Sequence, residues 1–117
     1  MKDYKERDIY QRSVRFAVTV AKIVDTLPPK PSYQTVGKQL IRSATSISAN
    51  IAEGSGGVSR NDFVNFLSIS RKSAIESEHW LNMLKEFGII ISQDLMEECV
   101  EIIKILTSII SATKTKS

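Results

Sequence analysis

The chain has 117 residues, a length that suits one domain and buries a core without a metal ion or disulfide to reinforce it. Hydrophobic residues make up 42% and charged residues 25% of the chain, an ordinary globular composition that excludes a disordered protein. The net charge of +3 permits nucleic-acid binding without demanding it, and no apolar run approaches the ~20 residues of a membrane span.

Apolar residues at helical spacing predict a first helix over about residues 5–27, with Phe16, Val20 and Leu27 on its inner stripe. The helix is expected to stop at residues 28–31, where three of four residues are proline. Ser32 is the expected N-cap of a second helix over about 33–54. The helix is expected to end at Gly54 as its C′ residue, because glycine readily adopts the left-handed conformation favoured there.

Two further helices follow the glycine-rich turn at 54–57. Ser59 is the expected N-cap of a helix over about 60–87, and Gly88 is expected to close it. Ser92 is the expected N-cap of the last helix, over about 93–112. The polar residues 114–117 are expected to be frayed.

Short connections between long helices predict an all-α, antiparallel up-down-up-down four-helix bundle, with residues 1–117 as a single domain. The first and last helices each carry a second apolar row beside the inner stripe. These rows either widen the core of one chain or pack against other copies in a homo-oligomer. The rows contain Ala17, Val20, Val24 and Leu27 in the first helix and Val100, Ile103 and Ile110 in the last.

The second helix has an unusual centre, rich in serine and alanine, and serines of the third helix face it in the predicted bundle. Asn50 is unfavourable inside a helix, so a hydrogen-bond partner is expected for it. Pairing of the two helices across their short turn brings Arg42 within about one turn of Glu76. We therefore predict a partly buried polar network of Arg42, Glu53 and Glu76 that sets the register of the two helices.

At this segment the chain resembles a family of small four-helix bundle proteins encoded in intervening sequences of bacterial 23S rRNA genes and historically labelled ribosomal proteins. The resemblance covers most of the chain, and its most specific part is N-I-A-E-G followed by F-x-x-F-L and S-x-x-E. The matching positions are Gln39, Arg42, Ala44, Ser46, Asn50, Ile51, Ala52, Glu53, Gly54, Ser59, Phe63, Phe66, Leu67, Ser73 and Glu76.

The resemblance implies homopentameric rings of bundles, and it extends to the accessory variability proteins of diversity-generating retroelements, whose rings bind a reverse transcriptase and nucleic acid. The chain departs from the family pattern in three respects. Ile41 and Ser43 stand where a second basic residue often accompanies Arg42, and Lys72 stands where a glycine is common. Residues 56–57 are glycines where the family often has a basic residue, although Arg60 lies nearby. These departures reduce the positive charge available for RNA.

Five basic residues of the first two helices are the candidates for phosphate contacts: Arg12, Arg15, Lys22, Lys38 and Arg42. On one monomer they predict weak, salt-sensitive binding, whereas repetition around a ring would raise the affinity. The alternative is a solvated surface that keeps the protein in solution.

No catalytic, metal or cofactor site is predicted. His79 is the only histidine and is expected on the helix surface beside Trp80, and Cys99 is expected as a small buried hydrophobe. The glycine-rich turn lacks the G-K-[ST] ending of a nucleotide loop and is expected to be a plain turn. Glu97, Glu98 and Glu101 are expected to form a solvated acidic face.

The sequence thus predicts a non-catalytic, cytoplasmic homo-oligomer that binds RNA or a ribonucleoprotein and has no membrane partner. The charged first eight residues, with no apolar segment behind them, agree with the cytoplasm. The alternative is an adaptor or scaffold ring that recruits a partner protein and has little affinity for nucleic acid.

Overall fold

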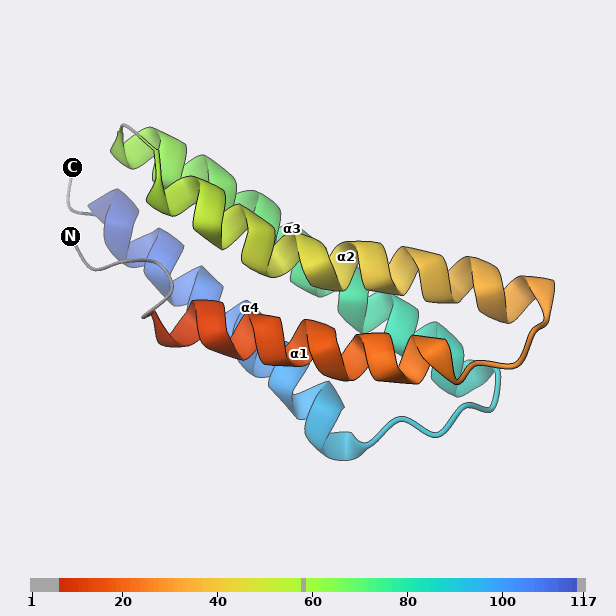
Figure 1. Ribbon diagram of the computed structural model, residues 1–117. Coiled ribbons are helices and arrows are strands. Elements are labelled where there is room, and N and C mark those ends of the chain that lie inside the picture. The colour runs from red at the N-terminus through yellow and green to blue at the C-terminus, as the bar shows by residue number, and fades with distance from the viewer. Residues whose placement is uncertain (1–6, 58, 116–117) are drawn as a thin grey trace.

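Short connections join four long helices that run in alternating directions (Figure 1). The computed structural model describes residues 7–57 and 59–115. In this part of the chain the helices are α1 (Asp8–Asp25), α2 (Pro31–Ser55), α3 (Arg60–Glu86) and α4 (Gln93–Thr115). Each helix packs against its two neighbours around the bundle, whereas in the described residues the helices of a diagonal pair bring no Cα atoms within 8 Å of each other. The predicted antiparallel up-down-up-down four-helix bundle is confirmed.

The core is built from one apolar stripe of each of the four helices. Val20, Leu40, Leu81 and Ile102 are completely buried, and burial of such side chains stabilises each by about 1.5–3 kcal/mol. In the second apolar rows, Ala17 is buried, and three partly buried members pack against the core: Val24, Ile103 and Ile110. These residues therefore widen the core within one chain. No helix in the described residues is long and apolar enough to cross a membrane.

The start of α2 differs from the prediction at Ser32. The helix already begins at Pro31, and its N-cap is Lys30, whose side chain makes no capping hydrogen bond. Proline is favoured at the first helical position, because its ring presets the helical φ and its missing N–H would have no helical partner there. The expected caps of the next two helices are confirmed: Ser59 Oγ accepts from the Asp62 N–H and Ser92 Oγ from the Leu95 N–H, both at 3.1 Å.

The end of α2 also differs from the prediction. Gly54 is buried inside the helix, which continues to Ser55 and is capped by Gly56 with a φ of −90°. The reason lies in α3: a Cβ atom on Gly54 would stand 3.0 Å from Phe66 Cβ. Gly54 therefore allows two helices to approach closely, and this requirement outweighs the left-handed turn that its sequence position suggested.

The ends of α3 and α4 support the remaining boundary predictions with one correction. Gly88 closes α3 with a φ of 98°, and the N–H of Ile89 bonds to the Leu84 carbonyl at 2.9 Å, as in a Schellman motif. Helix α4 extends to Thr115, so residues 114–115 of the expected frayed tail are helical. The rest of that tail, 116–117, and the predicted start of the first helix at 5–6 lie outside the described residues.

Candidate functional site

A line of serine hydroxyls holds α2 and α3 together. The hydroxyls of Ser43 and Ser77 are 2.8 Å apart, and Ser70 Oγ donates to the Ile47 carbonyl at 2.8 Å. All three serines are buried, with no more than 6% of their surface exposed. Small side chains permit this close approach, and each buried hydroxyl has a partner, so the seam avoids the cost of an unsatisfied polar group.

The seam opens outward at Ser46, Asn50 and Ser73. Asn50 Nδ2 donates to the carbonyl and the hydroxyl of Ser46 at 2.8 and 2.9 Å, and Ser73 Oγ donates to Ser46 Oγ at 2.9 Å. The partner expected for Asn50 is therefore Ser46, one turn earlier in the same helix. The three residues form a hydrogen-bonded chain from the side of α2 to α3.

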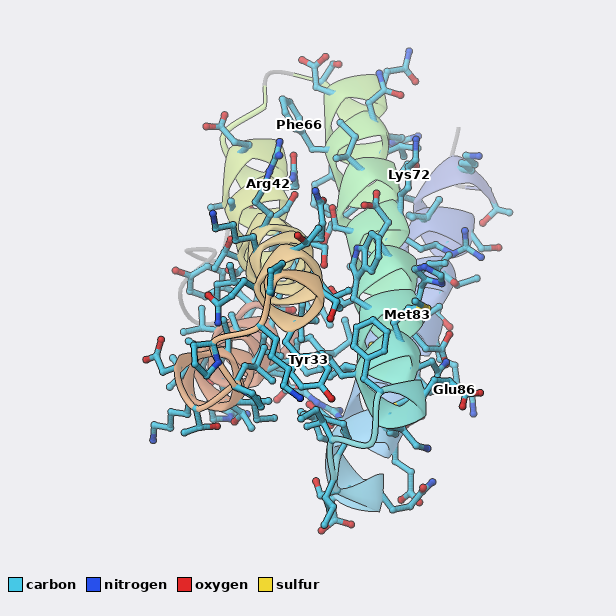
Figure 2. All side chains as sticks on the ribbon, turned by 90° about the vertical axis from the view of Figure 1, so that its right-hand side faces the viewer. Tyr33, Arg42, Phe66, Lys72, Met83 and Glu86 are labelled. Atoms are coloured by element: carbon cyan, nitrogen blue, oxygen red, sulfur yellow. The ribbon has the colours of Figure 1, made fainter. Side chains whose placement is uncertain are left out.

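Above this chain lies a shallow polar depression of about 230 Å³. Its lining consists of Gln39, Arg42, Ser43, Ser46, Ser73 and Glu76. Figure 2 looks along the bundle and shows Arg42 and Phe66 at the edge where α2 and α3 meet, on the side away from α1 and α4. We call this surface the α2–α3 groove.

The predicted network of Arg42, Glu53 and Glu76 is not formed. All three side chains are exposed, and within the described part of the chain Arg42 makes no ion pair within 4.0 Å. Arg42 and Glu76 do line the same groove, as the pairing predicted, but Glu53 is not part of its lining. The buried contacts that set the register are made by serines, because charged groups would lose more hydration free energy in this narrow seam.

Arg12 is not an open phosphate-binding residue. Its Nη2 lies 2.6 Å from Glu98 Oε1 and its Nε 3.0 Å from Glu98 Oε2, in a two-point contact between α1 and α4. The hydrogen bond to Glu98 raises the pKa of the Arg12 guanidinium, and the negative charges of Glu98, Asp8 and Glu101 add to this effect. Glu98 therefore does not belong to the predicted solvated acidic face, since its side chain is only 32% exposed, whereas Glu97 and Glu101 are exposed as predicted.

Single substitutions of either partner should measure how much this contact stabilises the fold. Replacing Arg12 with methionine or Glu98 with glutamine should lower the free energy of unfolding by about 1 kcal/mol, since the pair is charged and half-buried. The pair Lys104–Glu101 is a matched control, with 3.9 Å between the charged atoms and well-exposed side chains, so its loss should cost less than about 0.5 kcal/mol. If urea unfolding showed the same loss of free energy of unfolding for both pairs, the stronger role given to the Arg12–Glu98 contact would be contradicted.

The remaining basic candidates do not form one surface. Arg15 lines a depression with Asp94 and Glu98 on the α1–α4 side, whereas Arg42 lines the α2–α3 groove on the opposite side of the bundle. Lys22 lies two helical turns beyond Arg15, and Lys38 lies one turn before Arg42; all four side chains are exposed. The basic charge is thus divided between opposite faces.

The residues considered for chemistry occupy structural or exposed positions. Cys99 is buried in the core, where burial raises its pKa to about 12, and its thiol donates to the Ala74 carbonyl at 3.4 Å. His79 is exposed, and its ring meets Trp80 edge-on with 4.6 Å between the ring centres. Over residues 7–57 and 59–115, no three His, Cys, Asp or Glu side chains are grouped as metal ligands would be.

Fold and site together define a small helical bundle in which polar side chains join α2 to α3 and a shallow groove between these two helices carries exposed charged groups. The model of the 23S rRNA-intervening sequence protein family matches residues 5–108, and the chain belongs to this family. A similar solved structure is that of a protein with unknown function from the S23 ribosomal protein family of Bacteroides thetaiotaomicron VPI-5482. The two chains are 36% identical, with a TM-score of 0.81 over 88% of this chain and 95% of the other. No curated protein matches the sequence.

Proposed function

We propose that this protein is a non-catalytic, cytoplasmic homo-oligomer, a pentamer by analogy with its family, that binds RNA or a ribonucleoprotein through the α2–α3 groove. The observation that carries the proposal is the pair Lys38 and Arg42, two exposed basic side chains one turn apart on α2: Arg42 lines the groove, and Lys38 lies one turn before it, outside the lining. Gln39 beside them and Ser46 behind them supply amide and hydroxyl groups, which bind phosphate and sugar oxygens. Assembly would repeat this weak site in every subunit and raise the affinity.

The test is a salt series of fluorescence anisotropy with a labelled RNA hairpin. Wild type should bind at 50 mM salt, and affinity should fall as salt rises because bound phosphates release counterions. The double variant Lys38→Glu/Arg42→Glu should bind at least tenfold more weakly, with a salt slope reduced by about 2.

Two other double variants locate the site. Lys85→Glu/Lys104→Glu changes the net charge equally but alters a surface between α3 and α4, so its RNA affinity should fall much less. Arg15→Glu/Lys22→Glu tests the opposite face. If this variant loses more RNA affinity than the α2 double variant does, the RNA site lies on α1. Equal losses of RNA affinity in all three double variants would indicate that binding depends on net charge alone, and would contradict a site in the groove.

A second function is favoured by the division of the basic residues between two faces, since each face then offers only a few positive charges to a phosphate backbone. On this alternative the assembly is an adaptor that recruits a partner protein. Absence of RNA binding at 50 mM salt, in a preparation that is folded and assembled, would select it.

A further inference from the structure

Three polar side chains line the α2–α3 groove without taking part in its serine seam. They are the amide of Gln39, the guanidinium of Arg42 and the carboxylate of Glu76, and all three are exposed. Within residues 7–57 and 59–115, none of these groups makes a hydrogen bond or an ion pair. The serine hydroxyls of the lining, by contrast, are already used in hydrogen bonds between the two helices. The groove therefore offers donors and acceptors to another molecule.

Arg42 and Glu76 place opposite charges on the two sides of the groove. Arg42 belongs to α2 and Glu76 to α3, and their charged atoms are more than 4.0 Å apart. A phosphate group between them would be attracted by one side chain and repelled by the other, so this part of the groove is poorly suited to the RNA backbone. A ligand with two acceptors on one edge and two donors on the next would satisfy both groups.

Guanine is the base with this arrangement. Its O6 and N7 atoms accept two hydrogen bonds, and the planar fork of an arginine side chain matches them. Its N1–H and N2–H groups are two adjacent donors, which the two oxygens of one carboxylate can accept. Adenine, cytosine and uracil each set an acceptor beside the donor on that edge, and a carboxylate oxygen would be repelled by it. In unpaired RNA both edges of a base are accessible.

The size of the groove and a neighbouring aromatic ring agree with one base. The volume of about 230 Å³ corresponds to roughly eight water molecules at ~30 Å³ each, which is the scale of a single base rather than of a duplex. Trp80 follows Glu76 by four positions and Ser77 by three, and Ser77 bonds to α2, so Trp80 lies on the groove side of α3. Its ring is partly exposed, and unpaired bases stack on such rings.

We infer that the α2–α3 groove binds one unpaired guanine, with Arg42 donating to its O6 and N7 atoms and Glu76 accepting from its N1–H and N2–H groups. The inference rests on the proposed function and names the base that the RNA presents. Lys38 and Lys72 each stand one turn before a groove residue, exposed and outside the lining, so both are left for the phosphates. The guanidinium of Arg42 has five N–H groups, so it can also donate to a phosphate beside the base.

The test compares two labelled RNA hairpins by fluorescence anisotropy, with one guanine or one adenine in an otherwise all-uracil loop. Wild type should bind the guanine hairpin about tenfold more tightly or better. Glu76→Gln should bind the guanine hairpin about fivefold more weakly or worse, because a glutamine amide sets a donor against one of the guanine donors. If Glu76 did no more than repel phosphates, this variant would bind both hairpins more tightly, which is a change in the opposite direction.

Two further variants separate base recognition from charge. Arg42→Lys keeps the charge and loses the planar fork, so it should lose the guanine preference while its salt dependence stays close to that of wild type. Glu86→Gln is the matched control: Glu86 is an exposed glutamate near the end of α3, away from Arg42 (Figure 2), and both affinities should stay at the wild-type value. All three variants replace exposed side chains, so their melting curves should match wild type.

Free GMP, with AMP for comparison, tests whether the guanine must belong to RNA. The chain has one tryptophan, so the single indole N–H signal of Trp80 in an NMR spectrum can follow the titration. A shift with GMP that AMP does not give, and that Glu76→Gln abolishes, would support the guanine site. The same result without any RNA binding would identify a free guanine nucleotide as the ligand.

Two results would overturn the inference: equal affinity of wild type for the two hairpins, or a guanine preference that survives in both Glu76→Gln and Arg42→Lys. Either result leaves the proposed function in place, because RNA would still bind. Loss of the RNA proposal alone has a different signature, in which neither hairpin binds but GMP gives its Glu76-dependent shift. If neither hairpin binds and GMP gives no such shift, both proposals are wrong.

Discussion

A Gly54→Val variant is expected to lose about 2–3 kcal/mol of folding free energy, because it inserts a branched side chain where α2 and α3 almost touch. A Cβ atom alone would stand 3.0 Å from Phe66 Cβ and 3.3 Å from Leu67 Cδ1. Leu67 is buried in the core, with only 1% of its surface exposed, so it has little room to move. The helices must separate or neighbouring side chains must leave their preferred rotamers. The melting temperature should fall by on the order of 10 °C.

The control for this variant is Gly56→Ala, two residues further along the chain. Gly56 has an ordinary φ of −90°, and a Cβ there would meet nothing closer than the Glu53 carbonyl at 3.7 Å. Its replacement should change stability by no more than about 0.5 kcal/mol. Valine is intrinsically no worse in a helix than glycine, so helix propensity cannot explain a loss at position 54. A Gly54→Val protein that melts at or above the wild-type temperature would show that the two helices do not depend on this close approach.

The fold was predictable because the periodicity extends over several turns of each helix. Phe16, Val20 and Leu27, the predicted inner stripe of the first helix, are all buried. Two of the boundary errors have different causes, a tertiary requirement in one case and a competing local preference in the other. Gly54 fits the local rule for a helix end, but the approach of α3 keeps it helical. Ser32 fits the rule for an N-cap, but Pro31 before it starts the helix.

The site was less predictable, because its interactions join residues that no local pattern connects. Arg12 and Glu98 are 86 positions apart, and each had a reasonable local interpretation as a solvent-exposed charge. Their pairing depends on how α1 lies against α4, which periodicity does not specify. For α2 and α3 the pattern correctly indicated polar contacts but suggested charged partners. A seam of hydroxyls such as Ser43 and Ser77 carries no stronger sequence signal than any serine-rich helix.

Seven of the positions that carry the family resemblance fall into two groups in the structure. Ser46, Gly54 and Ser73 make close contacts between α2 and α3, and Asn50 donates to Ser46 within α2, so this group holds the two helices in register. Gln39, Arg42 and Glu76 line the groove above those contacts, and none of the three is buried. The contacts of the first group hold α2 and α3 together, and this arrangement places the second group in one groove. Variants of the second group are therefore the ones expected to change binding without unfolding the protein.

The thiol of Cys99 is expected to be almost inert in the folded protein, and its reactivity should report unfolding. Burial raises its pKa from about 9 to about 12, so at pH 8 the reactive thiolate fraction is roughly a thousandfold lower than for an exposed cysteine. A Val18→Cys variant supplies the matched exposed thiol, since Val18 is 49% exposed. With a disulfide reagent at pH 8, the introduced thiol should react at once and Cys99 only as the chain unfolds.

The same pKa shift sets a direction for stability at high pH. A thiol whose pKa is raised by folding keeps its proton more tightly in the native state, so its contribution is complete below about pH 9. That contribution is lost as the pH rises toward 12, because the unfolded chain releases the proton first. A Cys99→Ala variant should lack this part of the alkaline decline in urea unfolding. Rapid modification of native Cys99 at pH 8, at the rate of the Val18→Cys thiol, would mean that α3 and α4 separate far more readily than their packing indicates.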